Sequence, residues 1–81
     1  MPIKPAVLPD LTMQRACRLL EAIRAAVPVT GVTTARLVDT LFHYRRAHAV
    51  TDAEYRAALK VLRDCGALNY KRGLYTRGEL F

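Results

Sequence analysis

The sequence predicts one small α+β domain, mostly helical, with a β-hairpin close to its C-terminus. The chain has 81 residues, the size of a single domain, and 52% of them are hydrophobic, which is enough to build one core. Apolar residues recur at helical spacing in three stretches before residue 66. Two short segments of strand-forming residues then flank a basic turn that contains Gly73.

The first third of the chain predicts an arm followed by a helix. Residues 1–9 contain three of the four prolines, which fix φ and lack an amide hydrogen, so we expect an extended arm there and the domain itself in residues 10–81. Asp10 is a suitable N-cap for a helix over residues 10–26, which Pro28 ends. The apolar stripe expected to face the core consists of Met13, Ala16, Cys17, Leu20, Ile23 and Val27.

The middle of the chain predicts a short connection and a second helix. Residues Val29–Val32 are too few for a helix and are expected to form a turn or a short strand. Thr33 or Thr34 is a suitable N-cap for a helix that runs to about Ala47. Its expected apolar face consists of Leu37, Val38, Leu41 and Phe42.

The third helix has the strongest local signals. Thr51 and Glu54 have the spacing of a capping box, in which each side chain bonds the other residue's backbone amide. Gly66 ends the helix because glycine takes the left-handed conformation of a helix C-terminus without steric cost. We therefore predict a helix from Asp52 to Cys65.

A β-hairpin is predicted after this helix. Residues 67–70 and 74–76 are the expected strands, and the turn between them is the basic segment 71–73. The charge is concentrated in the same half of the chain. Between Arg45 and Arg77 there are eight basic and three acidic residues, which account for +5 of the net charge of +6. This distribution favours an anionic partner for the helix and hairpin.

This order of elements, a helix with a basic outer side followed by a hairpin with a basic tip, resembles the winged helix-turn-helix superfamily of DNA-binding proteins. The resemblance covers residues 10–77. It implies three helices and a C-terminal wing, with a short strand near Val29–Val32 that pairs with the wing. It also implies double-stranded DNA as the partner, with helix 52–65 in the major groove and wing 67–77 on the flanking backbone or in the minor groove. The implied role is that of an excisionase-like or repressor-like protein, a transcriptional regulator or an architectural factor.

The candidate DNA-binding side chains lie on four segments. Arg56, Lys60 and Arg63 recur at i, i+4 and i+7 and therefore share one side of the third helix. Arginine can bond guanine with two hydrogen bonds, but this helix has no Asn, Gln, Ser or Thr to read adenine or thymine, which favours phosphate contact and limited guanine readout. The full set of predicted DNA-binding residues is Arg45, Arg46, Thr51, Arg56, Lys60, Arg63, Asn69, Lys71, Arg72 and Arg77.

Other interpretations of the same charges stay open. The stripe could be an ordinary solvated basic face, and Arg45 and Arg46 could simply complement the dipole of the second helix. The main rival function is a protein-interaction winged helix, such as a small phage- or plasmid-encoded inhibitor or adaptor that binds an acidic protein surface. RNA binding is a lesser alternative, because the four tyrosines form no evident stacking platform.

Catalytic, metal and cofactor sites are not expected. The chain has no serine and no glycine-rich phosphate loop, and several acidic residues stand at helix caps. His43 and His48 are five residues apart, which is not the helical spacing of a metal pair.

The remaining expectations concern compartment and assembly. Cys17 and Cys65 are expected to be reduced core thiols of a cytoplasmic protein. The longest run without charge, Ala25–Ala35, is 11 residues and too short to span a membrane, and the N-terminus lacks the apolar region of a signal peptide. The arginine- and alanine-rich composition favours a bacterial, phage or plasmid gene. We expect a weak homodimer through the first helix, the arm or the Leu80–Phe81 end.

Overall fold

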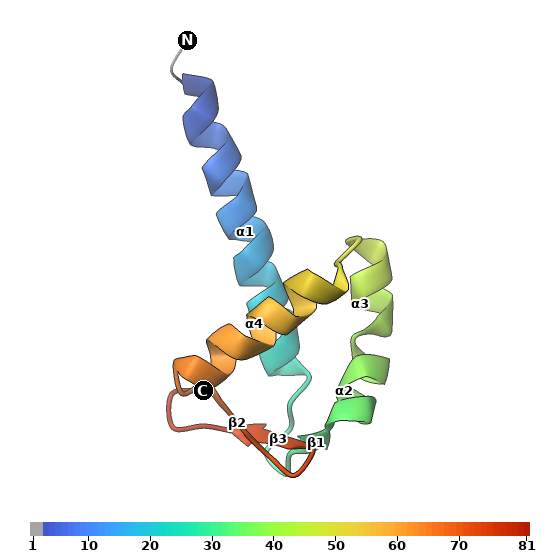
Figure 1. The fold of residues 1–81 in the computed structure, drawn as a ribbon. Coiled ribbons are helices and arrows are strands. Elements are labelled where there is room, and N and C mark those ends of the chain that lie inside the picture. The colour runs from blue at the N-terminus through green and yellow to red at the C-terminus, as the bar shows by residue number, and fades with distance from the viewer. Residues whose placement is uncertain (1–2) are drawn as a thin grey trace.

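The computed structural model describes the backbone of residues 3–81 and the side chains from Met13 onward. It is a mostly helical α+β domain, with four helices and a three-stranded antiparallel sheet in this described part (Figure 1). The elements in order are α1 (Ile3–Ala25), β1 (Val32–Thr33), α2 (Thr34–Thr40), α3 (Phe42–Ala47), α4 (Asp52–Asp64), β2 (Leu68–Lys71) and β3 (Leu74–Arg77). The predicted class of a mostly helical α+β domain is confirmed. Within the described residues, no helix is both long and apolar enough to cross a membrane.

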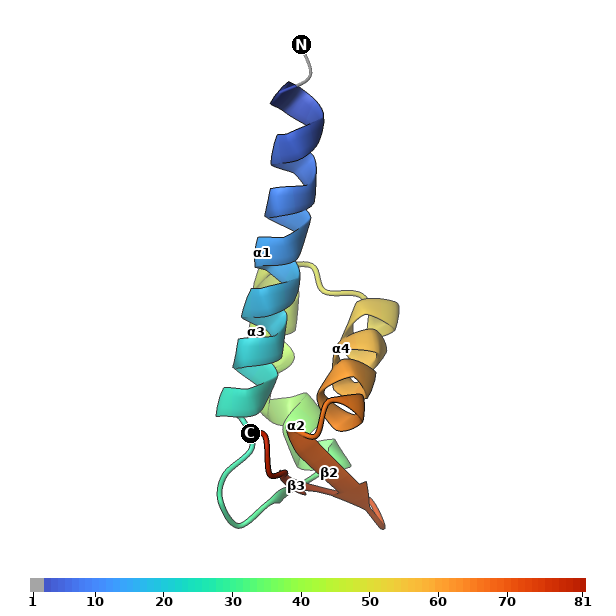
Figure 2. The same cartoon turned by 90° about the vertical axis from the view of Figure 1, so that its left-hand side faces the viewer.

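Helix α1 begins at Ile3, so the prediction of an extended arm over residues 1–9 is wrong from Ile3 onward. The first four amides of a helix have no acceptor within it, so Pro5 in the first turn removes no bond, and Pro9 removes only one. As a result α1 continues well beyond the other elements (Figures 1 and 2), and the molecule measures 50 × 27 × 18 Å along its principal axes.

The predicted second helix is divided into α2 and α3 at Leu41, which corrects the expected helix count from three to four. Leu41 leaves the helical conformation, with φ −92° and ψ 2°. One physical reason lies one residue earlier, where the hydroxyl of Thr40 donates to the carbonyl of Arg36 at 2.8 Å. Such a bond competes with the backbone ladder and bends helices. The predicted cap is confirmed, because the Thr33 hydroxyl accepts from the Arg36 amide at 3.2 Å.

Helix α4 follows its sequence signals closely. The Thr51 hydroxyl accepts from the Glu54 amide, and the Glu54 carboxylate accepts from the Thr51 amide, both at 3.1 Å. At the other end Gly66 has φ +87°, and the amides of Gly66 and Ala67 bond back to the last turn of the helix. This is the Schellman arrangement that glycine favours.

The sheet has the strand order β1-β3-β2, so the short strand predicted near Val29–Val32 is found at Val32–Thr33 and does pair with the hairpin. Lys71 pairs with Leu74, which leaves Arg72 and Gly73 as a two-residue turn. Both have positive φ, +54° and +78°, as a type I′ turn requires. The carbonyl of Gly73 also accepts from the amide of Thr34 at 3.0 Å, which fixes the hairpin tip to the start of α2.

The core lies between α1, α2, α4 and the sheet. Burial of each large side chain there stabilises the fold by roughly 1.5–3 kcal/mol. The fully buried side chains are Val27, Ile23, Leu37 and Leu68. Cys17 and Cys65 are free but exposed, so their assignment to the core is wrong, and Met13 is 66% exposed. Phe81 covers part of the core edge, whereas its neighbour Leu80 is 71% exposed.

Candidate nucleic-acid interface

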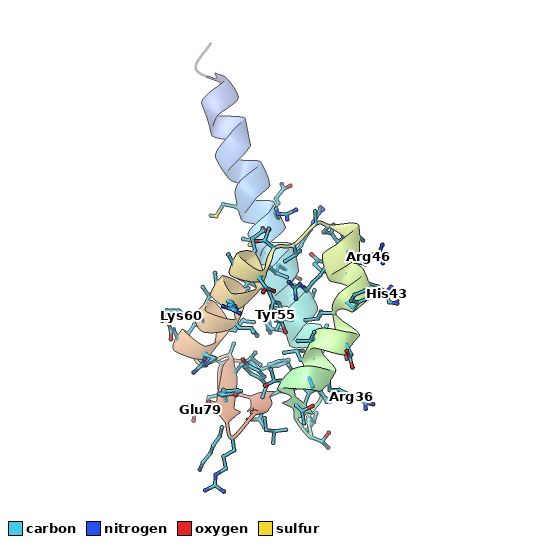
Figure 3. The ribbon with its side chains drawn as sticks, turned by 45° about the vertical axis from the view of Figure 1, so that its right-hand side comes forward. Arg36, His43, Arg46, Tyr55, Lys60 and Glu79 are labelled. Carbon is cyan, nitrogen blue, oxygen red and sulfur yellow. The ribbon has the colours of Figure 1, made fainter. Side chains whose placement is uncertain are left out.

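The outer side of α4 presents Arg56, Lys60 and Arg63, all of them exposed. The opposite side of the helix is buried and consists of Tyr55, Ala58, Leu59 and Leu62. Figure 3 shows this division, with Lys60 outside α4 and Tyr55 pointing inward between α4 and α3. The predicted stripe therefore lies on the surface, where an external partner can reach it.

Two of these three cations have carboxylate partners on their own helix. The Lys60 ammonium lies 3.0 Å from Asp64, and the Arg56 guanidinium lies 3.9 Å from Asp52. With Glu54 included, α4 carries three acidic and three basic residues and has no net charge. Exposed i, i+4 pairs contribute only about 0.3–0.5 kcal/mol, so a phosphate can displace them at little cost.

Arg63 connects α4 to the hairpin. Its guanidinium lies over the ring of Tyr70 in β2, 5.1 Å from the centroid. The Tyr70 ring in turn packs against Tyr75 in β3, with centroids 4.6 Å apart, and Tyr75 is buried in the core. Burial also raises the pKa of Tyr75. The last turn of α4 and the start of the hairpin tip therefore form one continuous surface.

The hairpin tip presents Lys71 and Arg72, which are both exposed. Arg72 takes a left-handed conformation that costs an L-residue roughly 1–2 kcal/mol and that asparagine or glycine adopts more easily. A bulky cation at such a position is a reason to look for a function of that side chain.

Three predicted DNA-binding residues instead make contacts within the domain. The Thr51 hydroxyl is part of the capping box. The Arg45 side chain is only 20% exposed, donates to Asp52 at 2.9 Å and lies 4.6 Å from the centroid of the Tyr55 ring. Its hydrogen bond lowers the pKa of Asp52. Arg77 donates from Nε to the carbonyl of Val27 at 3.0 Å.

The remaining two predicted residues differ in position. Asn69 is exposed on β2, one residue before Tyr70. Arg46 lies over the ring of Phe42, 5.7 Å from the centroid. In Figure 3 Arg46 extends outward from α3 and Lys60 from α4, on opposite sides of the view. The structure does not bring Arg46 together with the stripe on α4.

Two features of the surface were not found from the sequence. Arg36 is exposed on α2, two residues after Thr34, whose amide bonds the hairpin turn. Arg15 of α1 makes a two-pronged contact with Glu54, at 2.8 and 2.9 Å, and also donates to the carbonyl of Ala49 in the turn before α4. The hydrogen bonds from Arg15, together with the one from the Thr51 amide, lower the pKa of Glu54 to about 2. Pairs so distant in sequence have no local pattern that reveals them.

Comparison with protein-family models, with curated proteins and with solved structures found no match. Within the described residues, no group of three or more His, Cys, Asp and Glu side chains could hold a metal ion. The surface contact that links α4 with the hairpin is that of Arg63 with Tyr70.

Proposed function

We propose that this chain is a winged-helix protein that binds double-stranded DNA, as a transcriptional regulator or an architectural factor. In this proposal α4 lies in the major groove and the hairpin of β2 and β3 lies on the flanking backbone. The contact between Arg63 and Tyr70 supports it best, because it joins the basic side of α4 to the basic hairpin tip. A helix alone or a hairpin alone would be weaker evidence, since exposed charges often serve solubility.

The chemistry of α4 favours backbone contact over detailed base reading. Besides its cations and carboxylates, its exposed side chains are Ala53, Ala57 and Val61, and none of these donates or accepts a hydrogen bond. In this arrangement the cations neutralise phosphates and position the helix. The exposed free thiols of Cys17 and Cys65 fit a reducing compartment, and we place the protein in the cytoplasm.

The rival proposal is a protein-interaction domain that binds an acidic protein surface. The observation that favours it is the absence of net charge on α4, since a helix in a major groove usually has excess positive charge. Capture from a host lysate before and after nuclease treatment separates the two functions. A stoichiometric acidic partner that survives nuclease supports the rival, and loss of all captured material supports DNA binding.

The direct test is fluorescence anisotropy with an arbitrary labelled duplex at several salt concentrations. We expect log K to fall with log salt at a slope that corresponds to about four or more phosphates. The variant Arg56→Ala with Lys60→Ala should abolish binding while the domain remains folded. No binding by the wild-type protein even at low salt would refute the proposal.

A matched control is Arg18→Ala with Arg46→Ala, which removes the same charge at two exposed positions on other helices, α1 and α3. This variant should keep most of the affinity. If it loses as much affinity as the variant of Arg56 and Lys60, binding follows total charge and the assigned face is wrong.

A further inference from the structure

We propose that a hollow at the junction of α2, α3 and the turn before α4 binds a small aromatic carboxylic acid. The inference does not rest on DNA binding. The hollow has a cavity volume of about 400 Å³, and its walls are Val38, Phe42, Arg45, Arg46 and Val50. Three of these side chains are apolar and two are cationic. Binding sites for small organic molecules have this composition, an apolar lining with a few polar groups that fix the orientation of the ligand.

The apolar wall explains why the ligand needs a ring. Val38 on α2 and Phe42 on α3 are four residues apart, and their side chains are 37% and 49% exposed. Val50 adds a half-buried side chain, and its amide donates to the carbonyl of Arg45 at 2.9 Å, which holds the turn against α3. An aromatic ligand that covers these side chains removes apolar area from water, which a sugar or another polar molecule does not do.

Arg45 supplies the polar group, and it is already held in place. Its Nη2 donates to Asp52 at 2.9 Å, and its guanidinium lies 4.6 Å from the centroid of the Tyr55 ring. Its Nε, however, is buried and has no hydrogen-bond partner among the described residues. A buried donor without an acceptor is rare and unfavourable. A carboxylate oxygen in the hollow would accept from this Nε, in a charge-assisted bond that does not require the arginine to be ordered first.

Arg46 determines the charge that the hollow selects. Its guanidinium lies 5.7 Å from the centroid of the Phe42 ring, beside the apolar wall. Asp52 balances the charge of Arg45, so the second arginine leaves the hollow with an excess of one positive charge. This excess matches a monocarboxylate. In the resulting arrangement the ring packs on Val38 and Phe42, and the carboxylate lies at the two arginines.

The test is a titration of the full chain, without nucleic acid, with cinnamate as the probe, followed by nitrogen–proton NMR. The Nε–H groups of arginines give signals of their own, so the proposed bond can be observed directly. We expect the Nε–H signal of Arg45 to shift downfield and to saturate with a dissociation constant below about 1 mM. Cinnamamide has the same ring without the charge, and acetate has the charge without the ring. Each should bind at least about tenfold more weakly.

Two substitutions test the arrangement, with circular dichroism to verify that each variant folds. Arg45→Lys keeps the positive charge beside Asp52 but removes the Nε donor, so it should weaken cinnamate binding about tenfold or more. Val38→Glu places a carboxylate at an exposed position of the wall, where it repels the ligand, and should weaken binding by a similar factor. The matched control is Val29→Glu, which adds the same charge at a position that is 78% exposed and outside the hollow. It should leave binding unchanged.

Three results would overturn the inference. The first is binding of cinnamamide as tight as that of cinnamate, and the second is unchanged binding by Val38→Glu. The third is a largest shift at an arginine outside the hollow, such as Arg24, whose Nε is also buried without a partner among the described residues. Because no DNA is present in these experiments, such a failure leaves the proposed function untouched.

Discussion

Replacement of Arg72 by asparagine should make the domain more stable and its DNA binding weaker. Arg72 has φ +54° at the first position of the hairpin turn, and Asn-Gly is the preferred sequence for this turn type. The left-handed conformation costs an ordinary L-residue roughly 1–2 kcal/mol, of which asparagine avoids a part. We expect a gain of about 0.5–1 kcal/mol in the free energy of unfolding, or about 2–8 °C in Tm for a domain of this size.

The same substitution removes one cation from the proposed interface. The slope of log K against log salt should therefore fall by about 0.9, the value for one lost phosphate contact. Urea unfolding measures the first effect and anisotropy titration the second, with Arg72→Lys as a control that keeps both the charge and the backbone conformation. If Arg72→Asn destabilised the domain, the strain argument would be refuted. If it bound DNA with an unchanged salt slope, the hairpin tip would not contact the backbone.

Other predictions test the turn before α4 and its cap. Ala49 has φ +50°, so Ala49→Gly should raise the free energy of unfolding by about 0.5 kcal/mol in urea titrations, and a loss would contradict this. Thr51→Ala should lower the free energy of unfolding by about 1 kcal/mol through the lost cap but leave DNA affinity unchanged. Reduced affinity would indicate that Thr51 contacts DNA after all. Because the pKa of Glu54 is about 2 instead of 4.5, the unfolded chain binds more protons between these pH values, so stability should fall as pH falls through that range. Glu54→Gln should lose less stability over the same range, and an identical pH profile would show that the contact with Arg15 contributes nothing.

The elements that the sequence predicts well are those with local signals. The Thr51 cap and Gly66 define α4 because both act within one helical turn, and Gly73 defines the hairpin turn in the same way. The break at Leu41 was missed because apolar periodicity continues through it, and a contributing bond, from the Thr40 hydroxyl to the Arg36 carbonyl, leaves no trace in that periodicity. The start of α1 was missed because Pro5 lies in a first turn that tolerates proline and Pro9, further along, removes a single backbone bond from a helix of 23 residues.

The candidate interface shows the same difference between local signals, which the sequence reveals, and contacts between distant segments, which it does not. Helical spacing was enough to place Arg56, Lys60 and Arg63 on one exposed side of α4. Whether a cation is available to a partner depends on contacts between distant segments, and spacing says nothing about these. Arg77 bonds the carbonyl of Val27, fifty residues earlier, and the stacking of Arg63 on Tyr70 depends on how the chain turns after α4.

Cations that form ion pairs within the domain can still support the proposed DNA interface. Asp52 and Glu54 stand in the first turn of α4, where they stabilise the helix dipole but would repel a phosphate. Arg45 pairs with the first of these carboxylates and Arg15 with the second, so both negative charges are neutralised from within the domain. None of the ion pairs among the described side chains involves the cations at the C-terminal end of α4 and at the hairpin tip, Arg63, Lys71 and Arg72. Arg18, Arg36 and Arg46 are likewise outside these ion pairs, but Arg63, Lys71 and Arg72 lie on the last turn of α4 and the hairpin that follows it, and we expect them to hold the phosphate backbone beside Arg56 and Lys60.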